Sequence, residues 1–209
     1  LSYTLSLHDA LPILSAQVIQ HNEHRFLVDC GEGTQRQILR SGMGFKGLNR
    51  ILITHSHLDH ILGLGGLVST LARWEAMDEI VIMGSPRTLE RIDDLLFRVV
   101  FRGVRPPIEV HLEEIAPGPI YDAKDFTVTA FPVVHRGADS LGYLFEEKSR
   151  RPFLLEKAEA LDIPPGPWRG HLVKGESVTL PDGRQIQPDD VLGPEREGVR
   201  VGIVGDTGR

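Results

Sequence analysis

The run I-L-I-T-H-S-H-L-D-H, from Ile51 to His60, constrains this chain more than any other stretch. An apolar, β-branched start predicts a buried strand, and it stops at a group of three imidazoles and one carboxylate. If the chain stays extended through the second histidine, His55 and His57 point to the same side, because side chains alternate along a strand. A lone histidine after a strand is usually structural, but four potential ligands in this register favour a metal site.

The residues after Leu58 indicate a helix. Leucines recur at helical spacing among small glycines, which predicts a helix packed closely on its neighbours. Asp59 and His60 then lie near its first turn and face a second point beside the one that His55 and His57 share. Zinc accepts imidazole and carboxylate ligands, and two ions about 3.5 to 4 Å apart can share one hydroxide. The stretch therefore predicts a dinuclear hydrolytic site.

The letters H-S-H-L-D-H resemble the H-x-H-x-D-H signature of the metallo-β-lactamase superfamily. That resemblance implies an α/β fold, an αββα sandwich with the metals at one edge of its two sheets. It also implies a histidine after an alternating strand at 125–134, and a carboxylate in G-D-T, after the apolar strand 201–204, that bridges both metals. The expected metal ligands are then His55, His57, Asp59, His60, His135 and Asp206.

Two further segments resemble ribonuclease Z. The first is D-C-G-E-G-T-Q, which begins at Asp29. Asp29 ends a predicted strand and is either a turn former or an acceptor that fixes the tautomer of a liganding histidine, and the resemblance favours the acceptor. The second is the order of basic residues, I-P-P-G-P and K-G-E-S-V-T-L-x-D-G, which resembles the flexible arm that grips the body of transfer RNA.

The composition of residues 148–175 agrees with such an arm. This Pro- and Gly-punctuated insert holds six basic and three acidic residues, whereas the whole chain has a net charge of −6. A basic segment on an acidic protein can hold a polyanion. An ordinary surface excursion is the alternative. The expected RNA-binding residues are Arg150, Arg151, Arg169 and Lys174.

The resemblance to ribonuclease Z implies a zinc-dependent endoribonuclease that removes the 3′ extension of precursor tRNA and leaves a 3′ hydroxyl. It implies two zinc ions per subunit in the complete enzyme and a homodimer. Asp59 is the expected catalytic residue, because it can orient or deprotonate the attacking water as well as bind the second metal. The alternatives are another hydrolase of the superfamily, arylsulfatase-like or a phosphodiesterase, and a non-catalytic RNA-binding fragment.

Composition limits the other classes. The mildly acidic charge gives no global field for nucleic acid, so any polyanion site is local, and no DNA partner is expected. Cys30 is the one cysteine, which rules out an internal disulfide and agrees with a reducing compartment. No apolar run approaches the roughly 18 residues of a membrane span. We expect a cytoplasmic protein with no membrane partner.

Both ends of the sequence are unusual. Thr4 to Ile13, T-L-S-L-H-D-A-L-P-I, resembles the translation of a common short-read sequencing adapter. Residues 1–13 are therefore expected to be an artefact outside the fold, and residues 14–209 a truncated metallo-β-lactamase domain. The family has a later histidine that completes the second metal site. Without it, this chain is expected to bind the second metal weakly and to have little activity.

Overall fold

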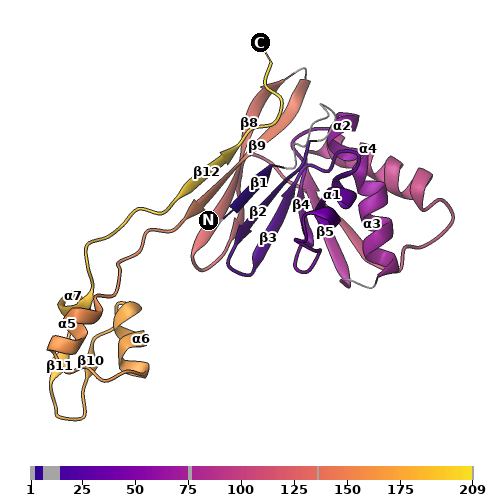
Figure 1. Cartoon of the computed structure of the whole chain (residues 1–209). Coiled ribbons are helices and arrows are strands. Elements are labelled where there is room, and N and C mark those ends of the chain that lie inside the picture. The colour runs from indigo at the N-terminus through magenta and orange to yellow at the C-terminus, as the bar shows by residue number, and fades with distance from the viewer. Residues whose placement is uncertain (1–2, 7–14, 75–76, 136, 209) are drawn as a thin grey trace. The chain divides into compact units, whose positions relative to one another are not determined.

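The structure is a computed structural model that describes residues 3–6, 15–74, 77–135 and 137–208. The chain forms two compact units (Figure 1). Unit 1 consists of Leu1–Phe145 and Arg200–Arg209, and unit 2 of Glu146–Val199. No helix among the described residues has the length and apolar character that crossing a bilayer requires.

The larger sheet of unit 1 has its strands in the order β1-β2-β3-β4-β5-β6. The pairs from β3 to β6 are parallel, so their carboxyl ends meet at one edge of the sheet. Apolar residues fill the middle strands, as expected where both faces of a parallel sheet are covered. The strands are β1 (Tyr3–Ser6), β2 (Gln17–His21), β3 (His24–Val28), β4 (Arg50–Leu52), β5 (Glu79–Gly84) and β6 (Glu109–Glu114).

The smaller sheet has the order β12-β9-β8-β7. Its strands are β7 (Gly118–Asp122), β8 (Phe126–His135), β9 (Gly137–Glu147) and β12 (Arg200–Ile203). The two sheets pack face to face around one apolar core that includes Phe26, Phe126, Tyr143 and Phe145. Because β12 follows unit 2 in the chain, the last strand returns to the sheet that the chain left after β9.

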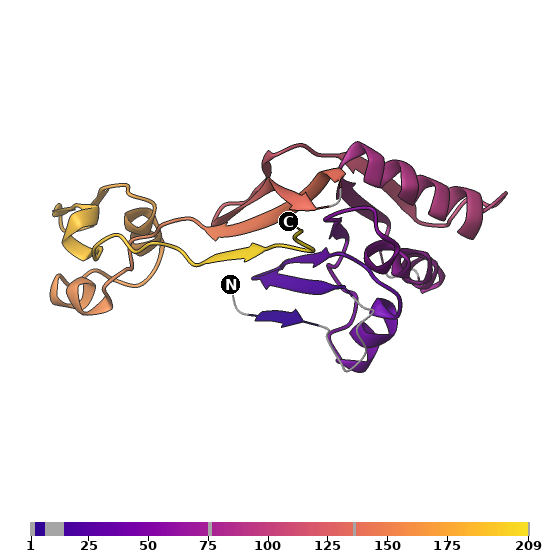
Figure 2. The same ribbon diagram turned by 90° about the horizontal axis from the view of Figure 1, so that it is seen from above.

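Helices cover the outer face of the larger sheet through a second apolar core. They are α1 (Thr34–Arg40), α2 (Leu58–Ile61), α3 (Gly63–Arg73), α4 (Pro86–Asp93) and the π-helix η1 (Asp94–Val100). Figure 2 shows this layering from above. In the described part of unit 1 no helix belongs to the core of the smaller sheet, so the layers are α, β and β. The expected αββα sandwich is present in incomplete form.

The N-terminal segment differs from the expectation. Residues 1–13 were expected outside the fold, yet β1 pairs antiparallel with β2 at the edge of the larger sheet. An edge strand is held by backbone hydrogen bonds, which any extended sequence can supply. The composition of this segment therefore did not predict that it pairs with β2. Residues 1–2 and 7–13 lie outside the described residues, and the adapter origin of the segment stays a prediction.

Unit 2 has a small core of its own. Its elements are α5 (Leu155–Ala160), α6 (Pro167–Val173), α7 (Pro188–Val191) and a two-stranded sheet of β10 (Val178–Thr179) and β11 (Gln185–Ile186). Seven buried apolar residues form the core, and Trp168 packs against it. The insert expected at 148–175 lies within this unit, which continues to Val199.

Candidate metal centre

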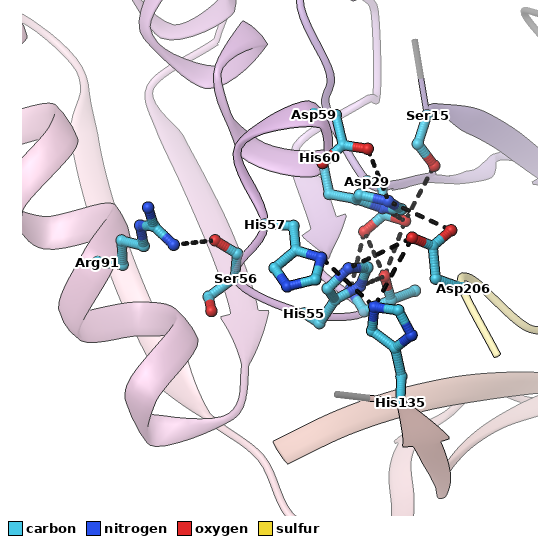
Figure 3. A network of polar contacts seen from close by, with 11 residues as sticks. Ser15, Asp29, His55, Ser56, His57, Asp59, His60, Arg91, His135 and Asp206 are labelled. Carbon is cyan, nitrogen blue, oxygen red and sulfur yellow. Dashed lines mark hydrogen bonds and ion pairs between the residues drawn. The ribbon is translucent and has the colours of Figure 1, made fainter. Parts of the chain in front are cut away.

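The candidate ligands gather at one edge of unit 1. The strand β4 ends at Leu52, and five residues later the chain reaches His57, the N-cap of α2. The smaller sheet supplies His135 at the end of β8 and Asp206 just after β12. Figure 3 shows these side chains converging on one place. The structure thus brings together all six residues that the sequence predicted as ligands.

The six side chains form two groups that share one member. One group is His55, His57, His135 and Asp206, and the other is Asp59, His60 and Asp206. Within each group, one ligand atom per residue lies within 4.8 Å of all the others. Asp206 is half exposed, whereas His55 and His60 are buried, so the groups open to solvent on the carboxylate side.

The carboxylate of Asp206 divides its two oxygens between the groups. Oδ2 lies 4.0 Å from His55 Nε2 and 3.8 Å from His135 Nε2. Oδ1 lies 3.8 Å from His60 Nε2, which is also 3.7 Å from Asp59 Oδ2. These separations are too long for hydrogen bonds. Each histidine nitrogen therefore faces a carboxylate oxygen across a gap, and a cation in that gap could be bound by both atoms.

One buried nitrogen supports a metal at this place. His55 Nε2, which faces Asp206, has no hydrogen-bond partner among the described residues. His135 Nδ1 is also without a partner there, but the nitrogen of that ring that faces Asp206 is Nε2. A buried polar atom without a partner is costly, and the great majority in native proteins have one. The His55 ring also lies 4.1 Å from that of His60 and 4.5 Å from that of His57, centroid to centroid. Imidazole and carboxylate donors at this density fit a divalent transition metal.

Asp29 connects the two groups from behind. This buried carboxylate accepts hydrogen bonds from the Thr54 backbone N–H at 2.8 Å and from the Thr54 hydroxyl at 2.9 Å. It also accepts from His60 Nδ1 at 2.8 Å and, more weakly, from the Ser15 hydroxyl at 3.3 Å. A proton on Nδ1 leaves the lone pair of His60 on Nε2, which faces Asp59 and Asp206.

Through Thr54, Asp29 also determines which ring nitrogen of His55 carries the proton. The threonine hydroxyl has one hydrogen, which it gives to Asp29, so it accepts from His55 Nδ1, 3.0 Å away. Nδ1 of His55 therefore carries the proton, and the lone pair is on the unpartnered Nε2. One carboxylate thus sets the tautomer of a histidine in each group, directly for His60 and through Thr54 for His55.

Burial and neighbouring charges shift the pKa values of two histidines in opposite directions. Burial, and next the neighbouring His60, lower the pKa of His55 to about 4. Burial also acts to lower the pKa of His60, but the hydrogen bond and the charge of Asp29 outweigh it and raise that pKa above its ordinary value. At neutral pH His55 is therefore neutral, which is the form that binds a metal.

Close backbone contacts fix the surroundings of the ligands. A Cβ on Gly205 would lie 2.9 Å from Thr54 Oγ1, so only glycine lets the segment after β12 come this near. A Cβ on Gly63, at the start of α3, would lie 2.0 Å from the carbonyl oxygen of Gly31. The Tyr143 hydroxyl, which is fully buried, donates to the Ile53 carbonyl at 2.6 Å. The contacts of Gly205 and Tyr143 hold the segment that leads to His55, and the contact of Gly63 holds the start of α3 against the turn after β3.

Sequence reasoning missed several of these supporting residues. Thr54 and Tyr143 read as ordinary strand residues, because an alternating pattern does not reveal which hydroxyl meets which acceptor. Arg91 on α4, which donates to the Ser56 carbonyl, had no signal either. The predicted RNA-binding residues Arg150, Arg151, Arg169 and Lys174 all lie in unit 2 and belong to neither ligand group.

The chain resembles known proteins along most of its length. The family described as "Beta-lactamase superfamily domain" matches residues 24–156. A ribonuclease Z of Bradyrhizobium diazoefficiens is 45% identical over 192 residues, which are 92% of this chain and 64% of that protein. A ribonuclease Z of Halorubrum lacusprofundi is 40% identical over 92% of this chain and 61% of its own length. The chain thus spans less than two thirds of these relatives.

The solved structure of human tRNase Z, short form, agrees with this result. It is 26% identical, with a TM-score of 0.55, over 65% of this chain and 57% of that one. The long form of RNase Z from yeast, at 16% identity and a TM-score of 0.55, shows the same fold. Because the family match covers more than half of the residues and the fold agrees with it, this chain belongs to the beta-lactamase superfamily.

Proposed function

We propose that this chain is the metal-binding part of a zinc-dependent endoribonuclease that removes the 3′ extension of precursor tRNA and leaves a 3′ hydroxyl. The observation that carries the proposal is Asp206, whose two oxygens face two separate groups of ligands. A split carboxylate of this kind suits a pair of cations that act on one phosphodiester. The similarity to proteins named ribonuclease Z supplies the substrate class.

The reaction is a hydrolysis at phosphorus. The water oxygen forms a new bond to phosphorus, the bond from phosphorus to the 3′ oxygen breaks, and that oxygen takes up a proton. Bound divalent ions supply Lewis acidity and lower the pKa of water to about 7, so a nucleophile is available at neutral pH. His55, His57 and His135 would hold one ion and His60 and Asp59 the other, with Asp206 between them.

Asp59 is the proposed catalytic residue. Its side chain is about half exposed, with Oδ2 3.7 Å from His60 Nε2. A carboxylate at the open side of the site can accept the proton of the attacking water or orient it. Asp29 would keep the histidine lone pairs directed at the ions, since it bonds the opposite ring nitrogen of His60 and, through Thr54, that of His55.

The arm is the proposed contact with the body of tRNA, and its fold refines that proposal. Arg151 donates to Asp189 and to the Gly193 carbonyl, and Arg169 donates to the Ile163 carbonyl. These two guanidinium groups therefore have structural partners inside unit 2. Arg150 and Lys174 are exposed, which makes them the better candidates for phosphate contacts. Zinc as the metal, a homodimer and a cytoplasmic location complete the proposal and rest on the family resemblance.

A metal titration combined with RNA cleavage tests the proposal. The purified chain should bind one equivalent of zinc firmly and a second weakly, and cut precursor tRNA slowly to a product with a 3′ hydroxyl. His57→Ala should lower the cleavage rate by about 100-fold or more, as expected when a metal ligand is lost. The control is His111→Ala, which removes a half-exposed histidine on β6 that belongs to neither ligand group. No cleavage by the parent chain, together with RNA binding that His57→Ala leaves unchanged, would favour the non-catalytic RNA-binding alternative.

A deletion separates tRNA processing from other hydrolysis within the superfamily. Arg150 and Arg196 pair at the base of unit 2, so residues 151–195 can be replaced there by a short turn. The shortened chain should lose processing of precursor tRNA but keep hydrolysis of a small diester such as bis(p-nitrophenyl) phosphate. Unchanged processing would refute the role given to the arm. Hydrolysis of the small diester by the full chain without any processing of precursor tRNA would favour an arylsulfatase-like enzyme or a phosphodiesterase, because neither needs the arm. Circular dichroism must show that the shortened chain is folded.

A further inference from the structure

The histidine rings of the candidate site differ in the hydrogen bonds that hold them. The ring of His60 is held by a direct hydrogen bond from Nδ1 to Asp29, and the ring of His55 by the contact with Thr54. In the described part of the chain, no carboxylate or carbonyl bonds the ring of His57. Its Nδ1 lies 3.4 Å from His135 Nε2, another candidate ligand. The position of His57 must therefore depend on the backbone that carries it.

That backbone is anchored from outside the site by Arg91. Its Nη1 donates to the carbonyl oxygen of Ser56, the residue between the two histidines, at 3.0 Å. Figure 3 shows the guanidinium reaching Ser56 from α4, on the side of the loop away from Asp29. The loop is thus held on its inner side by the bond from the Thr54 N–H to Asp29 and on its outer side by Arg91.

Helix α4 fixes the backbone of Arg91, whose side chain is exposed. The buried face of α4 consists of Thr88, Leu89 and Ile92, so Arg91 stands at the border of this face, three residues after Thr88. The hydroxyl of Ser85, the N-cap of α4, donates to Thr88 Oγ1 at 2.9 Å and fixes the first turn. Because the helix is packed on the sheet, the guanidinium restrains the Ser56 carbonyl relative to the rest of unit 1.

We propose that Arg91 is a positioning residue, which holds the Ser56 carbonyl and so fixes the directions of His55 and His57 toward a metal. The inference rests on the proposed function, since it concerns the same site. The role is that of a hydrogen-bond donor to a neutral carbonyl, so geometry matters more than charge. Arg87, one helical turn earlier, carries the same charge but lies 3.7 Å from Asp139 instead. This neighbour offers a matched control.

Titration with Zn²⁺ alone, in competition with a chromophoric chelator, measures the effect. Arg91→Gln should lower the affinity for the first ion by about tenfold, the lower end of what loss of a supporting partner costs. Arg91→Lys should recover most of it, because an ammonium can still donate to the carbonyl. Arg87→Gln should bind like the parent chain. In the Co²⁺-loaded protein, the visible absorption bands should change for Arg91→Gln only, since they report ligand geometry.

The outcomes separate the inference from the proposed site. Parent-like affinity and Co²⁺ spectrum in Arg91→Gln would overturn the inference while leaving the metal site in place. An equal loss in Arg87→Gln would overturn it too, because charge and not the anchor would then be responsible. A parent chain that binds no Zn²⁺ would refute the proposed site itself and the inference with it. Apo Arg91→Gln should melt within about 2 °C of the parent, as expected for an exposed substitution.

Discussion

Replacing Asp29 with asparagine should separate folding from metal binding. Asp29 has a left-handed backbone, φ 59°, which asparagine tolerates, so the backbone need not change. The amide oxygen can keep both bonds from Thr54, but the amide nitrogen then opposes the Nδ1 hydrogen of His60, 2.8 Å away in the parent. A buried hydrogen bond to a charged carboxylate is replaced by one to a neutral amide, which costs about 1 kcal/mol of unfolding free energy.

The same change should weaken the metal site. To accept a hydrogen bond from the amide, His60 must carry its proton on Nε2, so the lone pair no longer faces Asp206. Loss of a partner of this kind lowers metal affinity by roughly 10- to 100-fold. Chelator competition measures the zinc affinity, and urea unfolding followed by circular dichroism measures the stability.

A second left-handed aspartate provides the control. Asp162 in unit 2 has φ 51° and is exposed, so Asp162→Asn repeats the chemical change away from the site. It should alter the unfolding free energy by less than about 0.5 kcal/mol and leave zinc affinity unchanged. Asp29→Asn that binds zinc as tightly as the parent would refute the role given to Asp29.

Three further predictions concern two residues that pack next to the candidate site and the dependence of the free energy of unfolding on acid pH. Tyr143→Phe leaves a buried carbonyl without its donor and should cost about 1 to 2 kcal/mol in urea unfolding. Gly205→Ala brings a Cβ to 2.9 Å from Thr54 Oγ1, so stability should fall by about 1 to 3 kcal/mol in the same assay. Burial acts to raise the pKa of Asp125, but the hydrogen bond from His21 outweighs it and lowers that pKa. A carboxyl group whose pKa is lower in the folded than in the unfolded chain stabilises the fold at a pH above its unfolded pKa of about 3.9. That stabilisation is lost as the pH falls through the folded pKa. The free energy of unfolding of Asp125→Asn should therefore fall less than that of the parent between pH 5 and pH 3, as measured by acid titration. An equal fall would contradict the pairing of Asp125 with His21.

The first four candidate ligands were predictable because their information is local. Spacing within H-S-H-L-D-H indicates which side chains share a face, whereas His135 and Asp206 were expected only from the resemblance to the superfamily. The α/β sandwich followed from the resemblance that this motif carries, and the start of α4 from Ser85 followed by a proline. Short-range signals of this kind survive in one sequence because neighbouring residues alone determine them.

What could not be predicted depends on contacts between distant segments. The strand β7 has no clear alternation, and its pairing with β8 is interrupted by a register shift after Pro119. Unit 2 was expected as an insert with little apolar periodicity, because its core residues come from short helices, loops and β10 and β11. Over its full extent, Glu146–Val199, it holds eleven acidic and eight basic residues, so the basic character of residues 148–175 does not describe the whole unit.

The return of β12 after unit 2 has a consequence for biosynthesis. A nascent chain that has emerged as far as Val199 already contains the three motif histidines, Asp59 and His135, but not Asp206. Under the proposed function, ions taken up at that stage would lack the carboxylate shared by both groups and would be held by fewer ligands. Tight metal binding would then require that unit 2 has been translated and that β12 has paired with the smaller sheet. Retention of the metal would therefore indicate that the region up to Asp206 has been made and folded.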